Sequence, residues 1–160
     1  MVVVFSVAAV VVLLDQISKS WVVASMPGRA PIQLAGDWLQ ITYTRNPGAA
    51  FSMGGGLTIV LSLVAVGVIV FIVRTSSRLA SVAWAIALGG LLGGALGNLS
   101  DRLFRSPSPL RGHVVDWIEF PHWPVFNVAD ASIVCSAVLM VILSFRGIGL
   151  DGSRLSSPRD

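Results

Sequence analysis

Charge is scarce in this chain of 160 residues: only 12% of them are Asp, Glu, Lys or Arg, whereas 54% are hydrophobic. Soluble domains carry about twice that share of charge. With a mean hydropathy of +0.81, the chain cannot cover its hydrophobic residues with a polar shell. The composition therefore excludes an ordinary soluble domain and predicts a protein that is partly surrounded by lipid.

Cysteine and histidine are nearly absent, and this removes several kinds of site. The single Cys135 cannot form an intrachain disulfide, and its apolar segment contains no histidine to activate it as a nucleophile. His113 and His122 fall in one connection and form no His-Glu-x-x-His motif, so we expect neither a metal ion nor another cofactor. A serine–histidine site within the membrane is excluded too, because none of the apolar segments contains a histidine.

A concentrated basic patch is also missing. Eleven Lys and Arg residues against eight Asp and Glu give a net charge of +3, but the basic residues are scattered singly along the chain. Proteins that bind nucleic acid gather such residues into a face or a run. We therefore expect no nucleic-acid partner, and we interpret the basic residues as charges that flank membrane spans.

Four long apolar segments are present instead, at 2–23, 57–73, 79–100 and 126–145. A bilayer core of about 30 Å needs about 20 helical residues, so each segment can cross it, although the second is short. We expect the first to be a retained helix rather than a cleaved signal peptide, because no basic residue precedes it and no Ala-x-Ala follows it.

An even number of spans places both termini on one side of the membrane. Arginines favour the cytoplasmic side for the termini only weakly, since they also occur in the connections at 24–56 and 101–125. Four of the five tryptophans fall on the opposite side, as in an aromatic belt at the membrane interface. We predict cytoplasmic termini and two extracytoplasmic connections.

One stretch, at about 31–45, has the alternation of a strand rather than the pattern of a helix. Leu39, Ile41 and Tyr43 alternate with polar residues, and Asn46-Pro47-Gly48 ends the run with residues typical of turns. The predicted fold is an all-α membrane protein with four transmembrane helices and a small extracytoplasmic β-sheet. It comprises one domain at 1–146, followed by a cytoplasmic tail at 147–160 whose Gly, Ser and Arg content predicts disorder.

Polar residues of the predicted spans gather at one depth of the membrane. At 1.5 Å per residue, Asp15 and Lys19 lie about 20 Å along the first helix, toward its extracytoplasmic end. On the same side, the residues that end the third helix, open the fourth, or lie between them are Asn98, Asp101, Arg102, Asp116, Glu119, Asn127 and Asp130. Because carboxylates are costly in a bilayer, such a cluster indicates a functional site.

Structural explanations remain open for each member of the cluster. Asp15 and Lys19 are four residues apart and can form an ion pair, and the Asp101-Arg102 pair can anchor a helix end at the headgroups. Asn127 and Asp130 are suited to be a helix cap and a first-turn acid. We interpret the five glycines between 89 and 97 as small residues that let helices approach closely. Without Cys, His or a metal, the remaining carboxylates and carboxamides suit aspartyl chemistry.

Five motifs occur in order along the chain. They are Asp15-Gln16-Ile17-Ser18-Lys19, Asn46-Pro47-Gly48-Ala49-Ala50-Phe51-Ser52, Gly93-Gly94-Ala95-Leu96-Gly97-Asn98-Leu99-Ser100-Asp101-Arg102, Val114-Val115-Asp116 and Phe126-Asn127-Val128-Ala129-Asp130. Together they resemble the lipoprotein signal peptidases (signal peptidase II) of bacteria, over nearly the whole chain from the first predicted helix to the fourth.

The resemblance implies an aspartyl endopeptidase of the bacterial inner membrane, with its active site on the extracytoplasmic side. Asp116 and Asp130 fall on the positions of the catalytic pair. The positions that support this pair or position the substrate are Asp15, Lys19, Asn46, Asn98, Asp101, Arg102 and Asn127. The substrate is a prolipoprotein whose lipobox Cys already carries diacylglycerol, and the cut falls just before that Cys. We expect a monomer whose other partners are membrane lipids.

Two departures from the family pattern are present. The stretch from Asp101 to Asp116 is longer than usual and contains prolines at 107 and 109, which predict an extended loop beside the site. Trp117 stands where Phe is commoner. A proton-coupled transporter or channel subunit is the rival hypothesis, since it uses intramembrane carboxylates as a relay, but it predicts carboxylates spread across the membrane. A purely structural membrane protein leaves the clustering unexplained.

Overall fold

Four long helices and three short strands make up the described part of the protein. The computed structural model describes residues 1–48, 56–107 and 109–154. In chain order the elements are α1 (Val2–Ser25), β1 (Ile32–Gln33), β2 (Gln40–Asn46), α2 (Gly56–Ser76), α3 (Val82–Phe104), β3 (Val114–Glu119) and α4 (Val128–Phe145). All four helices are long and apolar enough to cross a membrane. The predicted class, four spanning helices with a small sheet, is confirmed.

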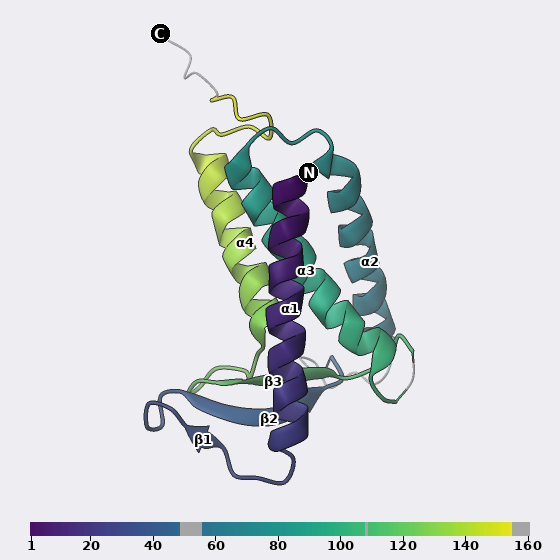
Figure 1. Ribbon diagram of the computed structural model, residues 1–160, viewed down its shortest axis with the longest axis vertical. Helices are drawn as coiled ribbons and strands as arrows, with labels where there is room; N and C mark the ends of the chain where they lie inside the picture. Colours follow the sequence, from purple (N-terminus) through teal and green to yellow (C-terminus); the bar gives the residue numbers. More distant parts are fainter. Residues whose placement is uncertain (49–55, 108, 155–160) are drawn as a thin grey trace.

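Helix α3 lies at the centre of the bundle and packs against each of the other three helices (Figure 1). Of the residues in the 18-residue apolar stretch of α3, 61% are buried, whereas the corresponding share in the other three helices is 17–22%. The glycines make this close packing possible: a Cβ at Gly93 would lie 2.6 Å from Val11 Cβ of α1, and one at Gly94 would lie 2.6 Å from the Ala129 carbonyl of α4. The expected packing role of the glycines is therefore confirmed on two faces of α3.

The sheet lies at the end of the bundle that is farthest from both described chain ends (Figure 1). Its order is β1-β2-β3, and both pairs are antiparallel. The register places Thr44 opposite Asp116 and Asn46 opposite Val114. This pairing brings the turn that follows β2 to the start of β3, close to the last turn of α3.

Strand β3 is a correction to the sequence analysis, which placed Asp116 and Glu119 in a loop. Val115 and Trp117 pack in a hydrophobic cluster with Val22 and Met26 at the end of α1. Asp116 lies between them in sequence, and because side chains alternate along a strand it points away from this cluster, toward Asn127 at the start of α4. The strand is short and its apolar partners lie on α1, so its own sequence gave little signal.

The described part of the C-terminal tail also differs from the expected disorder. Residues 147–154 form a turn against the start of α3, in which Trp84 Nε1 donates to the Ile148 carbonyl at 2.7 Å. The backbone N–H groups of Ala80 and Ser81 both donate to the Leu150 carbonyl at 3.1 Å. These bonds hold a segment that has little apolar surface of its own. Residues 155–160 lie outside the described residues.

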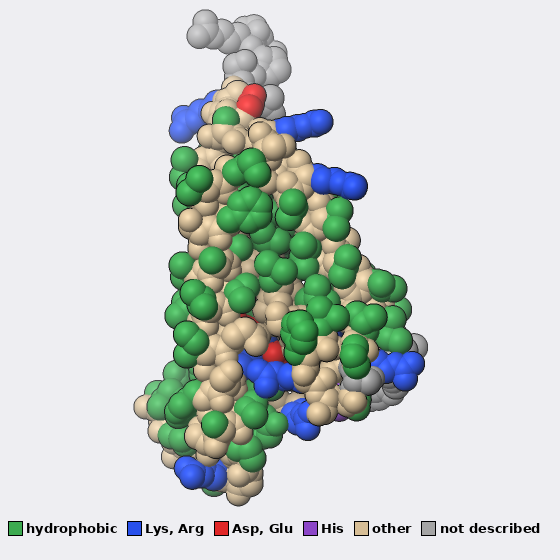
Figure 2. All heavy atoms as spheres, turned by 45° about the vertical axis from the view of Figure 1, so that its right-hand side comes forward, with side chains coloured by type: hydrophobic (Ala, Val, Ile, Leu, Met, Phe, Trp, Pro, Cys, Tyr) green, Lys and Arg blue, Asp and Glu red, His purple; other side chains and the backbone are tan. Residues whose placement is uncertain are grey.

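Large hydrophobic side chains remain exposed along the outer faces of α1, α2 and α4. Figure 2 shows them covering the middle of one face, with Lys and Arg side chains toward its two ends. Such a broad apolar surface is unusual for a protein in water, whereas lipid tails satisfy it. The distribution fits a multi-pass membrane protein whose charged residues flank the lipid.

Candidate active site

The polar residues predicted from the sequence meet beside β3, where the last turns of α3 and the first turn of α4 pack against α1. Lys19 is at the centre of a network of polar side chains from α1 and α3. Its ammonium lies 2.8 Å from Asp15 Oδ2 and 3.0 Å from Asp101 Oδ2, and it donates to Asn98 Oδ1 at 3.0 Å. The side chains of Lys19, Asp15 and Asp101 are all fully buried. The expected ion pair of Asp15 and Lys19 is therefore confirmed, as part of a larger network.

Asp101 connects this network to the sheet. Its Oδ2 accepts from the backbone N–H of Val115 at 3.1 Å, and its Oδ1 accepts from Arg105 Nε at 2.6 Å. Two cations and one strand N–H thus surround a carboxylate that would be costly to bury alone. Val115 directly precedes Asp116, so its bond to Asp101 fixes the position of this part of β3 relative to α3.

Gln16 belongs to the site, although the sequence analysis did not single it out. Its amide nitrogen donates to Asp15 Oδ2 at 3.0 Å, to the Gly97 carbonyl at 3.1 Å and to Asp101 Oδ1 at 3.3 Å. The sequence could have indicated this role, because Gln16 is an uncharged polar residue within an apolar span and belongs to the first of the five motifs. It joins α1 to α3 beside Lys19.

Asp15 also reaches across to α4. Its Oδ1 accepts from the backbone N–H of Ala129 at 3.0 Å. The first N–H groups of a helix lack partners within the helix and carry a partial positive charge, so a carboxylate is favourable there. Asp15 thereby fixes the start of α4, the turn that carries Asp130.

Asp130 lies in that first turn and is held by a capping box. Asn127 accepts from the Asp130 N–H at 2.9 Å, and Asp130 Oδ2 accepts from the Asn127 N–H at 3.3 Å. The predicted cap is therefore confirmed. Its other oxygen, Oδ1, accepts from Asn98 Nδ2 at 2.7 Å. The carboxyl group is thus oriented from both α3 and α4, and it is only partly buried.

Asp116 is held in the same manner by two carboxamides. Asn127 Nδ2 donates to its Oδ1 at 2.6 Å, and Asn46 Nδ2 donates to its Oδ2 at 2.9 Å. Burial raises the pKa of Asp116 to about 6, and the nearby charge of Asp130 acts in the same direction. The bonds from Asn46 and Asn127 oppose this rise, because they favour the ionised form.

Asn127 links the two carboxyl groups. Its Nδ2 donates to Asp116 and, more weakly, to Asn98 Oδ1 at 3.3 Å. Its backbone N–H donates to Asp130 Oδ2, and its side-chain Oδ1 accepts from the Asp130 N–H. The residue is completely buried. One side chain therefore sets the position of Asp116 on β3 relative to Asp130 on α4.

Arg102 brings a positive charge to the two carboxyl groups and has a donor to spare. Its charge acts on Asp130, Asp116 and Asp101. Among the described residues, its buried Nη1 has no hydrogen-bond partner. Arg102 and Asn98 also line a cavity of about 260 Å³ between α2, α3 and α4. A buried donor without a partner is costly, so this group is suited to meet a carbonyl oxygen of a ligand.

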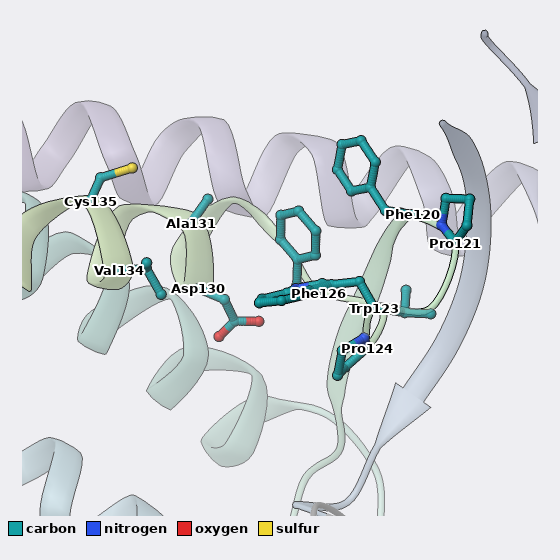
Figure 3. A pocket seen from close by; sticks show the side chains of 10 residues that line it. Phe120, Pro121, Trp123, Pro124, Phe126, Asp130, Ala131, Val134 and Cys135 are labelled. Carbon is teal, nitrogen blue, oxygen red and sulfur yellow. The ribbon is translucent and has the colours of Figure 1, made fainter. Parts of the chain in front are cut away.

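A second, larger cavity of about 690 Å³ opens beside Asp130. It lies between α4 and the segment that precedes it, and apart from Asp130 its walls are almost entirely apolar. Figure 3 shows the Asp130 carboxyl group beside the rings of Phe126 and Trp123, with Ala131 and Val134 on α4 next to it. The rings of Phe120 and Phe126 stack with centroids 5.9 Å apart. An acyl chain or another apolar group can therefore lie in this cavity, close to the Asp130 carboxyl group.

Some residues of the sequence analysis lie apart from this network. Glu119 ends β3, and His122 is exposed beyond it. Residues 49–52 of the second motif lie outside the described residues. In the described part of the chain, no group of three or more His, Cys, Asp or Glu side chains is arranged to hold a metal ion.

The predicted long loop after α3 is tied down at several points. Arg45 donates to the Ser106 carbonyl at 3.3 Å, and the Gly112 N–H donates to the Arg102 carbonyl at 3.0 Å. Ser108 lies outside the described residues. The loop therefore folds back over the end of α3, next to Arg102.

The site can perform acid–base chemistry on a bond placed between two carboxyl groups. Two such groups that interact share a proton more readily than they both ionise, so one can accept a proton while the other donates one. Each is oriented by carboxamides, which hold a geometry without adding charge. The surrounding cations, Lys19 and Arg102, limit the cost of the negative charge.

Comparison with known proteins gives consistent matches over most of the chain. A family model described as signal peptidase (SPase) II matches residues 7–146. The lipoprotein signal peptidase of Streptomyces griseus is 53% identical over 148 residues, which are 92% of this chain and 76% of that protein. The lipoprotein signal peptidase of Mycobacterium tuberculosis is 53% identical over 146 residues, which are 91% and 72%.

Two solved structures have a similar fold, and both are described as bacterial membrane enzymes determined by the in meso method. They superpose with TM-scores of 0.77 and 0.78 at 27% and 28% sequence identity. The alignments cover 89% of this chain and 87% and 92% of the respective structures.

Proposed function

The chain belongs to the signal peptidase II family, and on this premise we propose that it is an aspartyl endopeptidase acting at the membrane surface. Family membership supports a membrane-spanning protease that removes the signal peptides of prolipoproteins. The proposal adds the catalytic pair, Asp116 and Asp130. It also adds the position of the cut, just before a Cys that carries a diacylglyceryl group.

The observation that carries the proposal is the pairing of Asp116 and Asp130 through Asn127. Asn127 donates to Asp116 at 2.6 Å and forms a capping box with Asp130. No other arrangement of ionisable groups in the described residues combines a cavity, two carboxyl groups and a shared linker. An ion relay would need carboxylates spread through the membrane, and here they gather at one end of the helices.

The proposed reaction is hydrolysis by an activated water. The ionised carboxyl group takes a proton from water as the water oxygen attacks the scissile carbonyl carbon, while the protonated carboxyl group polarises the carbonyl oxygen. When the tetrahedral intermediate collapses, the C–N bond breaks and the leaving nitrogen takes up a proton from the dyad, which at that stage holds two. The peptide carbonyl becomes a carboxylic acid, and the dyad returns to its singly protonated form.

Several neighbours are proposed to position the dyad or the substrate. Asn46, Asn98 and Asn127 hold the two carboxyl groups. Arg102 Nη1, which has no hydrogen-bond partner among the described residues, donates to a substrate carbonyl. The buried network of Asp15, Lys19 and Asp101 fixes the ends of three elements on which the dyad depends.

The surroundings suit a substrate that is part lipid and part peptide. The apolar cavity beside Asp130 and the exposed apolar faces of the helices allow acyl chains to stay in a greasy environment. The peptide bond meanwhile reaches the polar end of the bundle, where water is available. We propose that this end faces the extracytoplasmic side of the bacterial inner membrane, with cytoplasmic termini and a monomeric enzyme.

Cleavage of a diacylglyceryl-modified prolipoprotein, followed by the precursor's size on a gel, tests the proposal. Wild type is compared with Asp116→Asn and Asp130→Asn, which keep the size of each side chain but remove the acid. Loss of a general acid or base typically costs 10²–10⁴-fold in rate, so we expect no visible product from either variant.

The exposed Asp37 gives a matched control, since Asp37→Asn makes the same chemical change away from the site. We expect this variant to cleave like wild type, and we expect an unlipidated precursor to stay intact. Cleavage by either dyad variant would contradict the assignment of the pair. A folded wild-type protein that leaves the lipidated precursor intact would contradict the peptidase itself.

A further inference from the structure

Helix α2 lies at one side of the bundle and packs against α3 (Figure 1). It carries no charged residue before Arg74, and its outer face is exposed and apolar. Two of its hydroxyl groups are nevertheless buried close to the site: Thr58 is 1% exposed and Ser62 is fully buried. A hydroxyl group in an apolar helix has to find a partner, and the two residues find different ones.

Thr58 donates outside its own helix. Its Oγ1 bonds to the carbonyl of Pro47, in the turn that follows β2. Buried hydroxyl groups within helices usually donate to a carbonyl of their own helix one turn earlier. Ser62 and Ser76 do so, toward the Thr58 carbonyl at 2.8 Å and the Val73 carbonyl at 2.7 Å, and the Ser62 hydroxyl group also lies 3.3 Å from the Leu110 carbonyl. Thr58 is at the third position of α2, so no carbonyl of its own helix lies one turn before it, and its hydroxyl group donates to the turn instead.

This turn holds a donor of the catalytic pair. Pro47 follows Asn46, whose Nδ2 donates to Asp116 Oδ2 at 2.9 Å and whose Oδ1 accepts from the Gly48 N–H at 2.8 Å. The turn also packs closely against α2 and α3. A Cβ at Gly48 would lie 3.2 Å from Leu61 Cδ1 on α2 and 3.9 Å from Arg102 Nη1 on α3. A shift of this turn would therefore move the Asn46 carboxamide relative to Asp116.

We propose that Thr58 is a positioning residue for catalysis, which acts through Pro47 and Asn46 to hold the carboxamide that orients Asp116. The inference rests on the proposed function of Asp116. A valine would fill the same space without a hydroxyl group and would be cheaper to bury in a membrane helix. The hydroxyl group therefore serves the position of the turn rather than the packing of α2.

The test compares Thr58→Val, which removes the hydroxyl group, with Thr58→Ser, which keeps it. Ser76→Ala is the control, because it removes a buried hydroxyl group at the other end of the same helix. With a lipidated precursor as substrate, we expect Thr58→Val to lower kcat about tenfold, as for the loss of one hydrogen bond, with little change in KM. Thr58→Ser and Ser76→Ala should retain a kcat within about twofold of wild type.

A pH profile separates positioning from general destabilisation. Asn46 favours the ionised form of Asp116, so a loosened Asn46 raises the pKa of that group further, and the alkaline limb of kcat/KM moves to higher pH. The other charges that act on Asp116 come from Lys19 on α1, Arg102 on α3 and Asp130 on α4. In the described part of the chain, none of these three side chains is hydrogen-bonded to Thr58, so their effect on Asp116 is common to all variants.

A double variant tests the route through Asn46. In single-turnover assays with excess enzyme, Thr58→Val should cause no further loss in an Asn46→Ala background. An equal loss in both backgrounds would overturn the proposal, as would a wild-type kcat for Thr58→Val or an unshifted alkaline limb.

The folded state of each variant is checked by thermal unfolding in detergent. If Thr58→Val does not fold, Thr58→Ala takes its place. If only Thr58→Ser folds, the hydroxyl group is needed for the fold itself, and the positioning role is overturned. An inactive wild type would instead count against the proposed function.

Discussion

Asp116 is the residue at which burial and hydrogen bonding compete most directly. Two carboxamides donate to its two oxygens, and both bonds favour the ionised carboxylate. Burial and the charge of Asp130 outweigh them and raise the pKa to about 6. The carboxyl group therefore keeps its proton to a higher pH than an exposed Asp does, which suits a member of a pair that shares one proton.

This balance predicts the alkaline limb of the pH profile. In the proposed mechanism the active enzyme has one proton on the pair, and that proton is lost as the pH rises through the raised pKa of Asp116. We expect kcat/KM, which reports the free enzyme, to fall above an apparent pKa near 6 and to lose about tenfold per further pH unit. The measurement is initial cleavage rate at low substrate between pH 4 and about 9. A rate that keeps increasing through this range would contradict a shared proton on Asp116.

At the scale of elements, α3 positions the other three helices, because each of them packs against it. It is the most buried helix, and it approaches α1 and α4 through glycines on two faces. At Gly97 a Cβ would lie 2.7 Å from Asp15 Oδ2, so the same close packing brings α1 to the buried ion network. The glycines of α3 therefore serve both packing and the site. They let the helix backbones approach closely, and this close approach lets Asp15 on α1 contact groups on α3 and α4.

Two glycines provide a matched test of this packing. In Gly93→Ala the new Cβ would meet Val11 Cβ at 2.6 Å and the Ala8 carbonyl at 2.8 Å, whereas at Gly67 of α2 nothing lies within 4 Å. We expect Gly93→Ala to destabilise the protein by about 1–3 kcal/mol, as for overpacked cores. Gly67→Ala should be neutral or stabilising by up to about 1 kcal/mol, because Ala favours helix. Thermal unfolding in detergent measures both, and equal effects of the two substitutions would contradict the role of the glycines.

At the scale of the whole molecule, the chain has two different ends. The end with both described chain ends carries Arg74, Arg78, Arg146 and Arg154, whereas the other end carries the sheet and the site (Figure 1). Basic residues also occur near the sheet, so charge alone decides the orientation weakly. The proposed orientation places the site outside the cytoplasm, where a precursor arrives after it has been translocated and lipidated.

Labelling of single cysteines tests this orientation. In a Cys135→Ser background, Asp37→Cys places a thiol in the exposed connection between β1 and β2, and Ser77→Cys places one in the exposed connection between α2 and α3. With a membrane-impermeant thiol reagent on spheroplasts, we expect Asp37→Cys to be labelled at once. Ser77→Cys should react only after the membrane is broken. The opposite pattern would place the site in the cytoplasm.

The sequence by itself determined the four spans and the depth at which polar residues gather, and its five motifs supplied the proposed dyad through their resemblance to a known family. These follow from local features: the length of apolar runs, the cost of charge in lipid, and motifs that are each a few residues long. The cap formed by Asn127 and Asp130 and the ion pair of Asp15 and Lys19 were predictable for the same reason, since partners three or four residues apart meet on one helix.

Only the tertiary structure decided which distant groups touch. The bonds from Asn46 to Asp116, from Asp15 to the Ala129 N–H and from Thr58 to Pro47 join segments whose relative rotation, tilt and register no local pattern specifies. Strand β3 and the ordered turn at 147–154 were missed because their partners lie far away in sequence. Close packing around α3 fixes these contacts, since a small rotation of one helix would move every polar group it carries away from its partner.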